Sequence, residues 1–289
     1  MDKRKIAFIG IGVMGKSIVK HLLKADHEVT VFTRTKEKAE MLVNNGATWA
    51  DSVAKAVKNA EIVITMVGYP SDVEEVYYAD GILDHAAEGA ILIDMTTSSP
   101  ALAKRIYADA KSKRLFSLDA PVSGGDVGAQ NGTLSIMCGG DQATFEKMEF
   151  LFKVFGSQII YQGDAGAGQH TKMCNQIAIA TNMIGVCEAL AYGREAGLDL
   201  DTVLQSISSG AAGSWSLSNL APRMIKEDFE PGFYVKHFLK DMDIALAEAE
   251  IMKLPLPGLQ MARDLYNRLS EEGFGDKGTQ VLYKQLTEK

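Results

Sequence analysis

Short runs of apolar, mostly β-branched residues alternate with helix-length segments along roughly the first 160 residues. The runs are apolar at nearly every position, as in strands that are buried on both faces of a parallel sheet. The segments between them place apolar residues three or four positions apart, which is typical of amphipathic helices. The pattern predicts an open, doubly wound α/β sheet, with strands at 6–9, 28–32, 62–67 and 90–94 and helices at 14–25, 36–44, 50–59, 71–78 and 100–112.

The remaining predicted elements divide the chain into a strand-containing half and a helical half. A strand at 133–138, a helix at 141–152 and a last strand at 158–162 complete the first half. After Gly168 every segment has helical spacing. Such a change marks a domain boundary, which we place between residues 1–164 and an all-α domain of residues 165–289. We expect the helices of that domain at 169–196, 199–208, 216–225, 235–252, 259–272 and 277–286.

Composition narrows the class of protein. Hydrophobic residues make up 46% of the chain and charged residues 23%, as in an ordinary globular protein. The net charge is −7 and neither half is basic, which argues against a nucleic-acid partner. No apolar stretch reaches the length of a membrane helix and the N-terminus has no signal-peptide core, so we expect no membrane partner and a cytoplasmic location. The five histidines lack ligand spacing, so no metal site is expected.

A glycine-rich turn follows the first predicted strand. Residues 10–15 read Gly10-Ile11-Gly12-Val13-Met14-Gly15, which matches the G-x-G-x-x-G pattern between a strand and a helix. The first glycine permits the tight turn, the second lets a pyrophosphate approach the backbone, and the third lets helix and strand pack closely. The turn, including Val13 and Met14, therefore predicts a dinucleotide-binding site of the Rossmann type.

The end of the second predicted strand bears on which dinucleotide is bound. An NAD site usually has an acidic residue there, which accepts a hydrogen bond from the ribose 2′-hydroxyl. This chain has Thr33-Arg34-Thr35 instead, and a guanidinium with two hydroxyls suits a 2′-phosphate. We therefore expect NADP to be preferred over NAD; the alternative is that Arg34 is only a solvated loop charge.

Four motifs, in order along the chain, resemble those of the β-hydroxyacid dehydrogenase family. They are the glycine turn with Met14, the segment Asp119-Ala120-Pro121-Val122-Ser123-Gly124-Gly125, the segment Gly168-Gln169-His170-Thr171-Lys172-Met173-Cys174-Asn175-Gln176, and Phe238-Leu239-Lys240-Asp241. The family includes 3-hydroxyisobutyrate dehydrogenase, tartronate semialdehyde reductase and succinic semialdehyde reductases of the glyoxylate reductase type; 6-phosphogluconate dehydrogenase is a more distant relative. The resemblance spans essentially the whole chain and implies a nicotinamide-dependent oxidoreductase that interconverts a small 3-hydroxy acid with its aldehyde or ketone.

The resemblance also implies roles for individual residues. Lys172 matches the catalytic lysine and Asn175 its polar partner one helical turn beyond. The remaining matches are the substrate-carboxylate loop of Ser123, Gly124 and Gly125, the cofactor contacts near the nicotinamide at Thr97 and Lys240, and a ribose-lining loop of Met66, Val67, Gly68 and Val73. Val67-Gly68-Tyr69-Pro70 departs from the leucine-proline common in the family, which favours a backbone role there.

The spacing around Lys172 is consistent with acid–base chemistry. Reducing a carbonyl needs a hydride donor on one side and a proton donor to the developing alkoxide, which a lysine can supply. Asn175 and Gln176 follow Lys172 by three and four positions, so all three share one helix face and can meet one substrate. The apolar neighbours of Lys172 favour this role over a solvated surface lysine, and desolvation beside Lys240 would lower its pKa.

Two further features of the helical half remain open. Trp215, within Gly213-Ser214-Trp215-Ser216, and Phe233 are candidates for the wall of the substrate pocket; equally, this segment is a loop with one packed tryptophan. The helical composition favours a homodimer or homotetramer that pairs through this domain.

We therefore expect an NADP-preferring 3-hydroxyacid dehydrogenase of the 3-hydroxyisobutyrate type, acting on a small carboxylate-bearing aldehyde or hydroxy acid. The alternative within the enzymes is a 2-hydroxy-3-oxopropionate (tartronate semialdehyde) or succinic semialdehyde reductase. The alternative outside them is a silent NADP-binding protein used in redox sensing or assembly. Lys172 argues against the last, because a silent protein has no chemical need for it.

Overall fold

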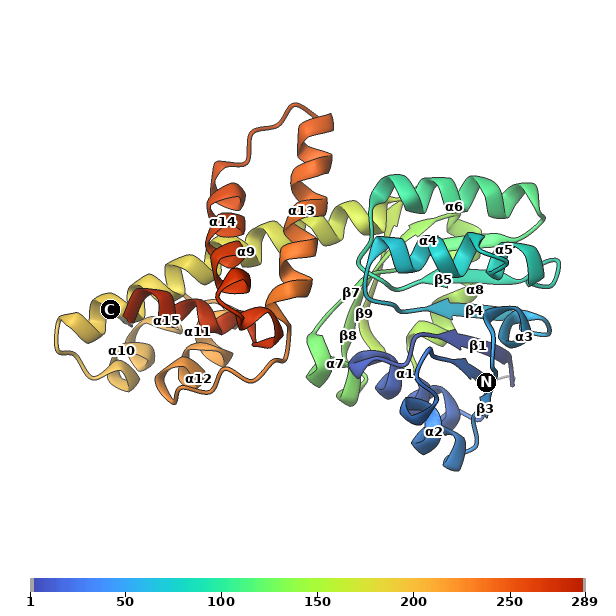
Figure 1. Cartoon of the computed structure of the whole chain (residues 1–289), viewed down its shortest axis with the longest axis horizontal. Helices are drawn as coiled ribbons and strands as arrows, with labels where there is room; N and C mark the ends of the chain where they lie inside the picture. The colour runs from blue at the N-terminus through green and yellow to red at the C-terminus, as the bar shows by residue number, and fades with distance from the viewer. Residues whose placement is uncertain (1–2, 288–289) are drawn as a thin grey trace. The chain divides into compact units, whose positions relative to one another are not determined.

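The computed structural model describes residues 3–287, which form two compact units (Figure 1). The units divide between Lys172 and Met173, inside a long helix. The sequence places the boundary slightly earlier, at the glycine-rich stretch before that helix. The first unit holds the sheet and the second is helical, so the fold class predicted from the hydrophobic pattern is confirmed.

The first unit is built on one nine-stranded sheet. Its strand order is β3-β2-β1-β4-β5-β6-β8-β7, with β9 paired to β8. The first six strands in this order, from β3 through β1 to β6, are mutually parallel. The order reverses at β1, between β2 and β4, and such switch points hold ligands at the carboxyl ends of the strands. The parallel strands are β1 (Lys5–Ile9), β2 (Glu28–Phe32), β3 (Thr48–Trp49), β4 (Ile62–Thr65), β5 (Ile91–Asp94) and β6 (Phe116–Asp119).

Both faces of this sheet are covered. Along β1, Ile6 and Phe8 belong to one apolar cluster whereas Ala7 and Ile9 belong to another. This alternation follows from the two-residue period of a strand and explains why the run is apolar throughout. The covering helices are α1 (Val13–Lys24), α2 (Glu40–Asn44), α3 (Val53–Val57), α4 (Pro70–Tyr78), α5 (Ile82–His85), α6 (Pro100–Ser112), α7 (Gly125–Asn131) and α8 (Gln142–Phe152), with a 3₁₀ turn at Lys36–Ala39.

The far end of the sheet differs from the sequence-based expectation. The chain forms the strand β6, the two-residue strand β7 (Val122–Ser123) and the helix α7 in a region where we predicted no regular elements. These three elements are short, and α7 contains two glycines, so none of them shows a clear repeat of apolar positions. β8 (Leu134–Gly140) runs antiparallel to β6 and β7 and parallel to β9 (Gly156–Gly163).

The second unit is a group of helices around its own core. The long helix α9 (Ala167–Glu195) begins in the first unit and continues here, within two residues of the predicted bounds. The predicted helix 216–225 is instead two helices that meet at Leu220, because Pro222 lacks an N–H and starts a new helix at its second position. The others are α10 (Leu200–Ile207), α11 (Trp215–Asn219), α12 (Ala221–Ile225), α13 (Val235–Ile251), α14 (Pro257–Glu271) and α15 (Leu282–Thr287), with 3₁₀ turns at Phe274–Asp276 and Thr279–Val281.

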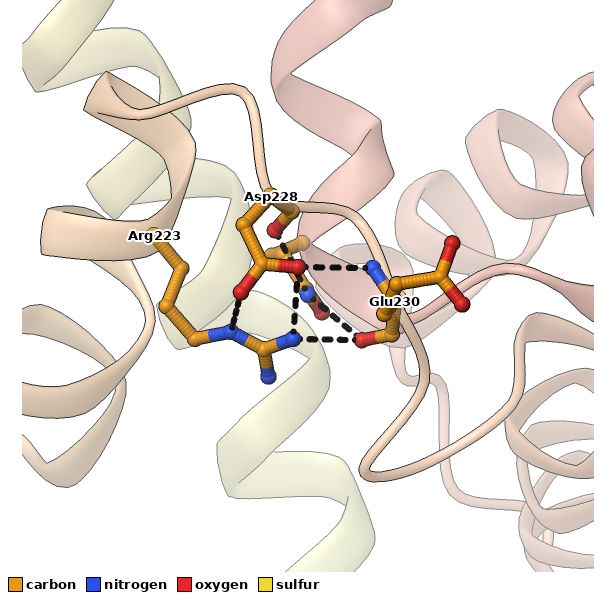
Figure 2. Close-up of polar contacts among 4 residues, drawn as sticks. Arg223, Asp228 and Glu230 are labelled. Carbon is orange, nitrogen blue, oxygen red and sulfur yellow. Dashed lines mark hydrogen bonds and ion pairs between the residues drawn. The ribbon is translucent and has the colours of Figure 1, made fainter.

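An ion-paired cluster fixes the loop that leads into α13. Arg223 donates to both carboxylate oxygens of Asp228, at 2.8 and 3.1 Å, and to the backbone oxygen of Glu230 at 2.6 Å (Figure 2). Gln280 Nε2 lies 3.1 Å from the backbone oxygens of both Asp228 and Glu230. The loop before Phe233 is thus held by side chains from α12 and from the C-terminal 3₁₀ turn.

Within residues 3–287 no helix is long and apolar enough to cross a bilayer.

Candidate active site

The glycine turn adopts the geometry that its sequence predicts. Gly10 has φ +103°, and a Cβ there would lie 2.2 Å from the backbone oxygen of Met66. A Cβ at Gly15 would lie 2.4 Å from the Gly10 oxygen and 3.0 Å from the ring of Phe8. Both positions therefore exclude any larger residue, so the turn can close tightly between β1 and β4.

Gly12 differs from these two glycines because the space around it is open. It is the N-cap of α1, and a Cβ there would meet no atom within 4 Å. The helix begins with no side-chain cap and no acidic residue in its first turn. Helix N-terminal amides and the positive end of the helix dipole favour an anion, and an open approach to the backbone lets a phosphate reach them. Val13, exposed, and Met14, half-buried, complete the turn.

Arg34 lies at the carboxyl end of β2 and bonds to two carboxylates of α4. Its Nη2 atom is 2.9 Å from Asp72 Oδ1 and 2.6 Å from Glu75 Oε2. These bonds and the negative charges raise the pKa of the guanidinium further above its usual value. Arg34 and its neighbours Thr33 and Thr35 stay at least partly accessible. The predicted phosphate ligand is therefore present at the expected strand end, already paired with acidic partners.

A buried carboxylate organises the loops that follow β4 and β5. Asp94 Oδ1 accepts hydrogen bonds from the Thr65 hydroxyl at 2.9 Å and from the Thr96 backbone N–H at 3.1 Å. The Thr96 hydroxyl in turn accepts from the Val67 N–H at 3.0 Å. The loop of Met66, Val67 and Gly68 is thus tied to the loop that carries half-buried Thr97. Val73, also expected to line this region, is fully buried in the apolar cluster under α4.

A second buried carboxylate holds the beginning of α9. Asp119 Oδ1 accepts from the Gly166 N–H at 2.8 Å, and its Oδ2 accepts from the Gln169 N–H at 2.9 Å. The Gln169 side chain donates to the Thr96 backbone oxygen at 2.7 Å and accepts from the Ser98 N–H at 3.0 Å. Burial raises the pKa of Asp119 to about 6, against the opposing effect of the two backbone bonds. The first turn of α9 is therefore clamped to the ends of β5 and β6.

Two glycines make room for this clamp. A Cβ on Gly168 would lie 2.3 Å from the Met137 oxygen and 2.8 Å from Asp119 Oδ2. A Cβ on Gly139, in β8, would lie 2.7 Å from Asp119 Oδ1. The helix start, the β8 strand and the buried carboxylate can approach this closely only because neither position has a side chain.

The predicted carboxylate-binding loop lies between β7 and α7. Ser123 ends β7, and Gly124 and Gly125 have φ of +125° and +62°. Two successive positive φ angles turn the chain sharply and are comfortable only for glycine. Gly125 has open space around it and Gly124 is exposed, so the backbone of this turn is accessible to a ligand.

Lys172, Asn175 and Gln176 lie on α9, as predicted. Lys172 is only 7% exposed and Gln176 is buried, whereas Asn175 is half-buried. Within the second unit, the Asn175 side chain donates to Gln176 Oε1 at 2.7 Å, and Gln176 Nε2 donates to Asp241 Oδ2 at 2.6 Å. Asp241 is 2% exposed and its other oxygen lies 3.0 Å from Lys240 Nζ. A polar chain therefore links the predicted site residues of α9 to Lys240 on α13.

The other predicted residues of the second unit have different surroundings. Phe233 is half-buried and its ring lies 5.4 Å from that of Phe238 in the helical core. Trp215 opens α11 and is 66% exposed, so it is not the packed tryptophan of the alternative interpretation. Burial, with Lys240 and Lys236 nearby, lowers the pKa of His237, which lies one helical turn before Lys240.

The first unit fits a dinucleotide at the carboxyl ends of its strands. The turn that excludes a Cβ at Gly10, the open backbone at Gly12 and the uncapped start of α1 suit a pyrophosphate. For a metal ion the chain offers less, since residues 3–287 contain no group of three or more His, Cys, Asp or Glu side chains that could hold one.

Three acidic residues that organise these loops and helices have no predicted role. Asp94 ends an otherwise apolar strand, Asp119 ends the largely buried strand β6, and Asp241 follows Lys240 in α13. An acidic residue that directly ends a buried strand is a usable signal, because it must find hydrogen-bond donors there. The partners themselves come from distant segments and cannot be identified from spacing.

Family models match both units. Residues 5–163 match the NAD-binding domain of 6-phosphogluconate dehydrogenase, and residues 166–286 match the NAD-binding domain of NADP-dependent 3-hydroxyisobutyrate dehydrogenase. The first unit is therefore an NAD(P)-binding domain.

Individual relatives extend over nearly the whole chain. An uncharacterized oxidoreductase of Bacillus subtilis, YkwC, is 61% identical over 283 residues, which are 98% of each chain. The NAD-dependent L-serine dehydrogenase of Pseudomonas aeruginosa is 36% identical over 97% of each chain. The solved structure of Mycobacterium tuberculosis 3-hydroxyisobutyrate dehydrogenase with L-serine is 29% identical, with a TM-score of 0.91 over 99% of each chain. The chain thus belongs to the β-hydroxyacid dehydrogenase family, the 3-hydroxyisobutyrate dehydrogenase-like NAD(P)-dependent oxidoreductases of the 6-phosphogluconate dehydrogenase superfamily.

Proposed function

We propose that this chain interconverts a small 3-hydroxy acid of the 3-hydroxyisobutyrate type and its semialdehyde, with NADP(H) preferred over NAD(H). Lys172 is the general acid and base. The observation that carries the proposal is the burial of Lys172 on α9 immediately after a turn fixed by Asp119 and Gln169. A lysine is rarely buried to this extent without a reason, and a proton donor to a reacting oxygen provides one.

In the reductive direction, NADPH held at the strand ends of the first unit would supply the hydride for the carbonyl carbon. The ammonium group of Lys172 gives its proton to the carbonyl oxygen, so that an alcohol forms and a neutral amine remains, which takes up a proton from solvent. In the oxidative direction the neutral amine accepts the hydroxyl proton. The first turn of α9 is tied to the loop that contains Thr96 and Thr97. The helix that carries Lys172 and the loop expected to contact the cofactor are therefore held in a fixed relation to each other.

The substrate carboxylate is assigned to the turn of Ser123, Gly124 and Gly125. This turn offers a hydroxyl and an accessible backbone without a fixed cation. Asn175 and Gln176 orient the substrate, with Gln176 held by Asp241 and Lys240 steadying the nicotinamide end. Trp215 and Phe233 are assigned to the pocket wall. The names of the relatives support substrates in which a hydroxymethyl carbon is bonded to the carbon that bears the carboxylate, as in L-serine.

We assign homo-oligomer formation to the second unit. Large apolar side chains remain exposed there, and such side chains favour a subunit interface. A loss of the oligomer in Ile251→Glu, measured by sedimentation, would support this assignment, and unchanged mass would count against it. The exposed residues are Tyr192, Leu198, Ile251, Met252, Leu254 and Met261.

The decisive experiment is an absorbance assay at 340 nm on a panel of compounds, in which semialdehydes are paired with NADPH or NADH and hydroxy acids with NADP+ or NAD+. The panel includes 3-hydroxyisobutyrate, L-serine, tartronate semialdehyde and succinic semialdehyde. Lys172→Ala is expected to lower kcat by roughly a thousandfold or more, as loss of a general acid does, while Lys58→Ala, an exposed lysine of the same unit, retains full activity. Cofactor binding without turnover of any compound would favour the silent NADP-binding protein instead.

A further inference from the structure

The ion pairs of Arg34 bear on cofactor choice, and this inference rests on the proposed function of the NAD(P) site. Asp72 and Glu75 both bond to the Nη2 atom of Arg34, at 2.9 and 2.6 Å. The two acceptors lie three residues apart on α4, so they share one face of that helix. Arg34 follows β2, where the fold would place the ribose of a dinucleotide. Its guanidinium therefore has two negative partners before any cofactor binds.

Asp72 is a fixed partner. Its Oδ2 accepts a hydrogen bond from the Tyr69 N–H at 3.0 Å and caps the first turn of α4, while Oδ1 receives Arg34. Its side chain is 19% exposed. Glu75 is 59% exposed and has no part in the cap, so its charge can be removed without disturbing the start of the helix.

The charge balance of this cluster opposes a phosphate. Arg34 contributes one positive charge, and Asp72 and Glu75 contribute two negative charges. A 2′-phosphate brings roughly two further negative charges, whereas a 2′-hydroxyl brings none. The nearby cation Lys36 lies over the Trp49 ring, with Nζ 4.7 Å from the ring centroid. The positive charge of Arg34, which would bind the 2′-phosphate, is thus offset by the two neighbouring carboxylates.

We propose that Asp72 and Glu75 determine cofactor specificity, because they compete with the 2′-phosphate for Arg34 and so reduce the preference for NADP over NAD. Glu75 is the adjustable member of the pair. In this arrangement NADP binding must weaken the Arg34–Glu75 ion pair, while NAD binding can leave it intact. The sequence at the end of β2 alone therefore overstates the preference for NADP.

The test is equilibrium binding of NADPH and of NADH, followed by nicotinamide fluorescence, to the full chain. In Glu75→Gln, the Kd for NADPH is expected to fall roughly threefold to tenfold, the effect of removing one charge a few ångströms from the phosphate, while the Kd for NADH changes less than about twofold. Glu75→Lys should extend the change in the same direction, and 0.5 M salt should reduce it in both variants.

Glu74→Gln is the matched control. Glu74 is the preceding residue of α4, is similarly exposed and pairs with Arg105 of α6 rather than with Arg34. It should leave both dissociation constants unchanged. The inference would be overturned if the ratio of NADPH to NADH affinity stayed constant in Glu75→Gln and Glu75→Lys. It would also be overturned if the ratio moved toward NADH, which would mean that the carboxylates orient Arg34 for the phosphate. Failure of the unmodified chain to bind either cofactor would instead overturn the proposed function.

Discussion

Asp119 accepts a hydrogen bond of 2.9 Å from the backbone N–H of Gln169, and this bond joins the carboxyl end of β6 to the first turn of α9. Lys172 lies one turn further along the same helix. The residue that we assign to proton transfer is therefore positioned from the sheet, through a carboxylate that is itself buried.

Replacing Asp119 should change how stability depends on pH. Burial raises its pKa from the usual 3.8 to about 6, so the folded chain binds the proton more tightly than the unfolded chain. The stabilising contribution of the protonated form is complete below pH 3.8 and is lost as pH rises through about 6. The free energy of unfolding of wild type relative to Asp119→Asn should therefore fall by about 2 kcal/mol between pH 4 and pH 7, measured by urea unfolding.

Two other titratable groups lie near Asp119. Asp94 is the nearby acid and Cys138 the nearby thiol, and burial already raises the pKa of Cys138 far above this range. Asp201→Asn, on an exposed position of α10, serves as the control. A stability difference between wild type and Asp119→Asn that is constant from pH 4 to pH 7 would contradict this assignment.

Gly168→Ala should destabilise the chain and reduce activity. Its new methyl group would meet the backbone oxygens of Met137 and Asp119 at 2.3 and 2.7 Å, and backbone atoms cannot move aside as the end of a flexible side chain can. We expect a loss of about 1–3 kcal/mol on thermal unfolding, together with a lower kcat because the start of α9 must shift. Gly185→Ala is the control on the same helix; nothing lies within 4 Å of its Cβ position, so it should stabilise by up to about 1 kcal/mol. Equal effects of the two substitutions would refute the packing argument.

Asp241 and Gln176 should act as a coupled pair. Their bond of 2.6 Å is buried and charge-assisted, so either single substitution leaves the other group without its partner. In a double-mutant cycle of Asp241→Asn and Gln176→Met, we expect a coupling energy of about 1–2 kcal/mol in unfolding experiments. Both single variants should also raise the KM for substrate, because Asn175 bonds to Gln176. Additive effects would show that the polar contacts that link Asn175, Gln176, Asp241 and Lys240 do not behave as a unit.

Arg223→Met should loosen the segment that precedes α13. Methionine keeps the apolar stem but removes the donors to Asp228 and Glu230. The guanidinium also lowers the pKa of Asp228, so the ion pair contributes above the usual pKa of that acid and is lost as pH falls through the lowered value. Faster chymotryptic cleavage after Phe229 or Phe233 is the expected result at pH 7. Arg268→Met, on the exposed face of α14, should leave the cleavage rate at its wild-type value.

Hydrophobic periodicity predicted the elements that bury the most surface. The strands around the glycine turn and the helix carrying Lys172 were located from apolar runs alone, because each is long or continuously buried. The strand β6 is not predicted, because it reads Phe-Ser-Leu-Asp and its apolar residues do not form a continuous run. Phe116 is also exposed, unlike the apolar residues of the central strands. The helix α7 escaped because glycine dominates its start.

The sequence predicts a set of candidate site residues but not the contacts between them. The glycine turn and Arg34 belong to a local pattern whose chemistry can be read directly. The partners of Arg34 lie on α4 and those of Gln169 lie in the β5 loop, so they depend on which strands become neighbours. That information is tertiary, and it changes the interpretation of Arg34 from a free phosphate ligand to one member of an ion-paired cluster.

The buried hydrogen bonds that run from the β4 loop to α9 also have a dynamic consequence. The amide hydrogens of Val67, Thr96, Ser98, Gly166 and Gln169 are all held by side chains that depend on one another for their positions. Opening any one of these bonds exposes polar groups that the others need, so we expect these amides to exchange with solvent through a shared opening rather than one by one. Three loops that are far apart in sequence would then unfold together as one cooperative unit.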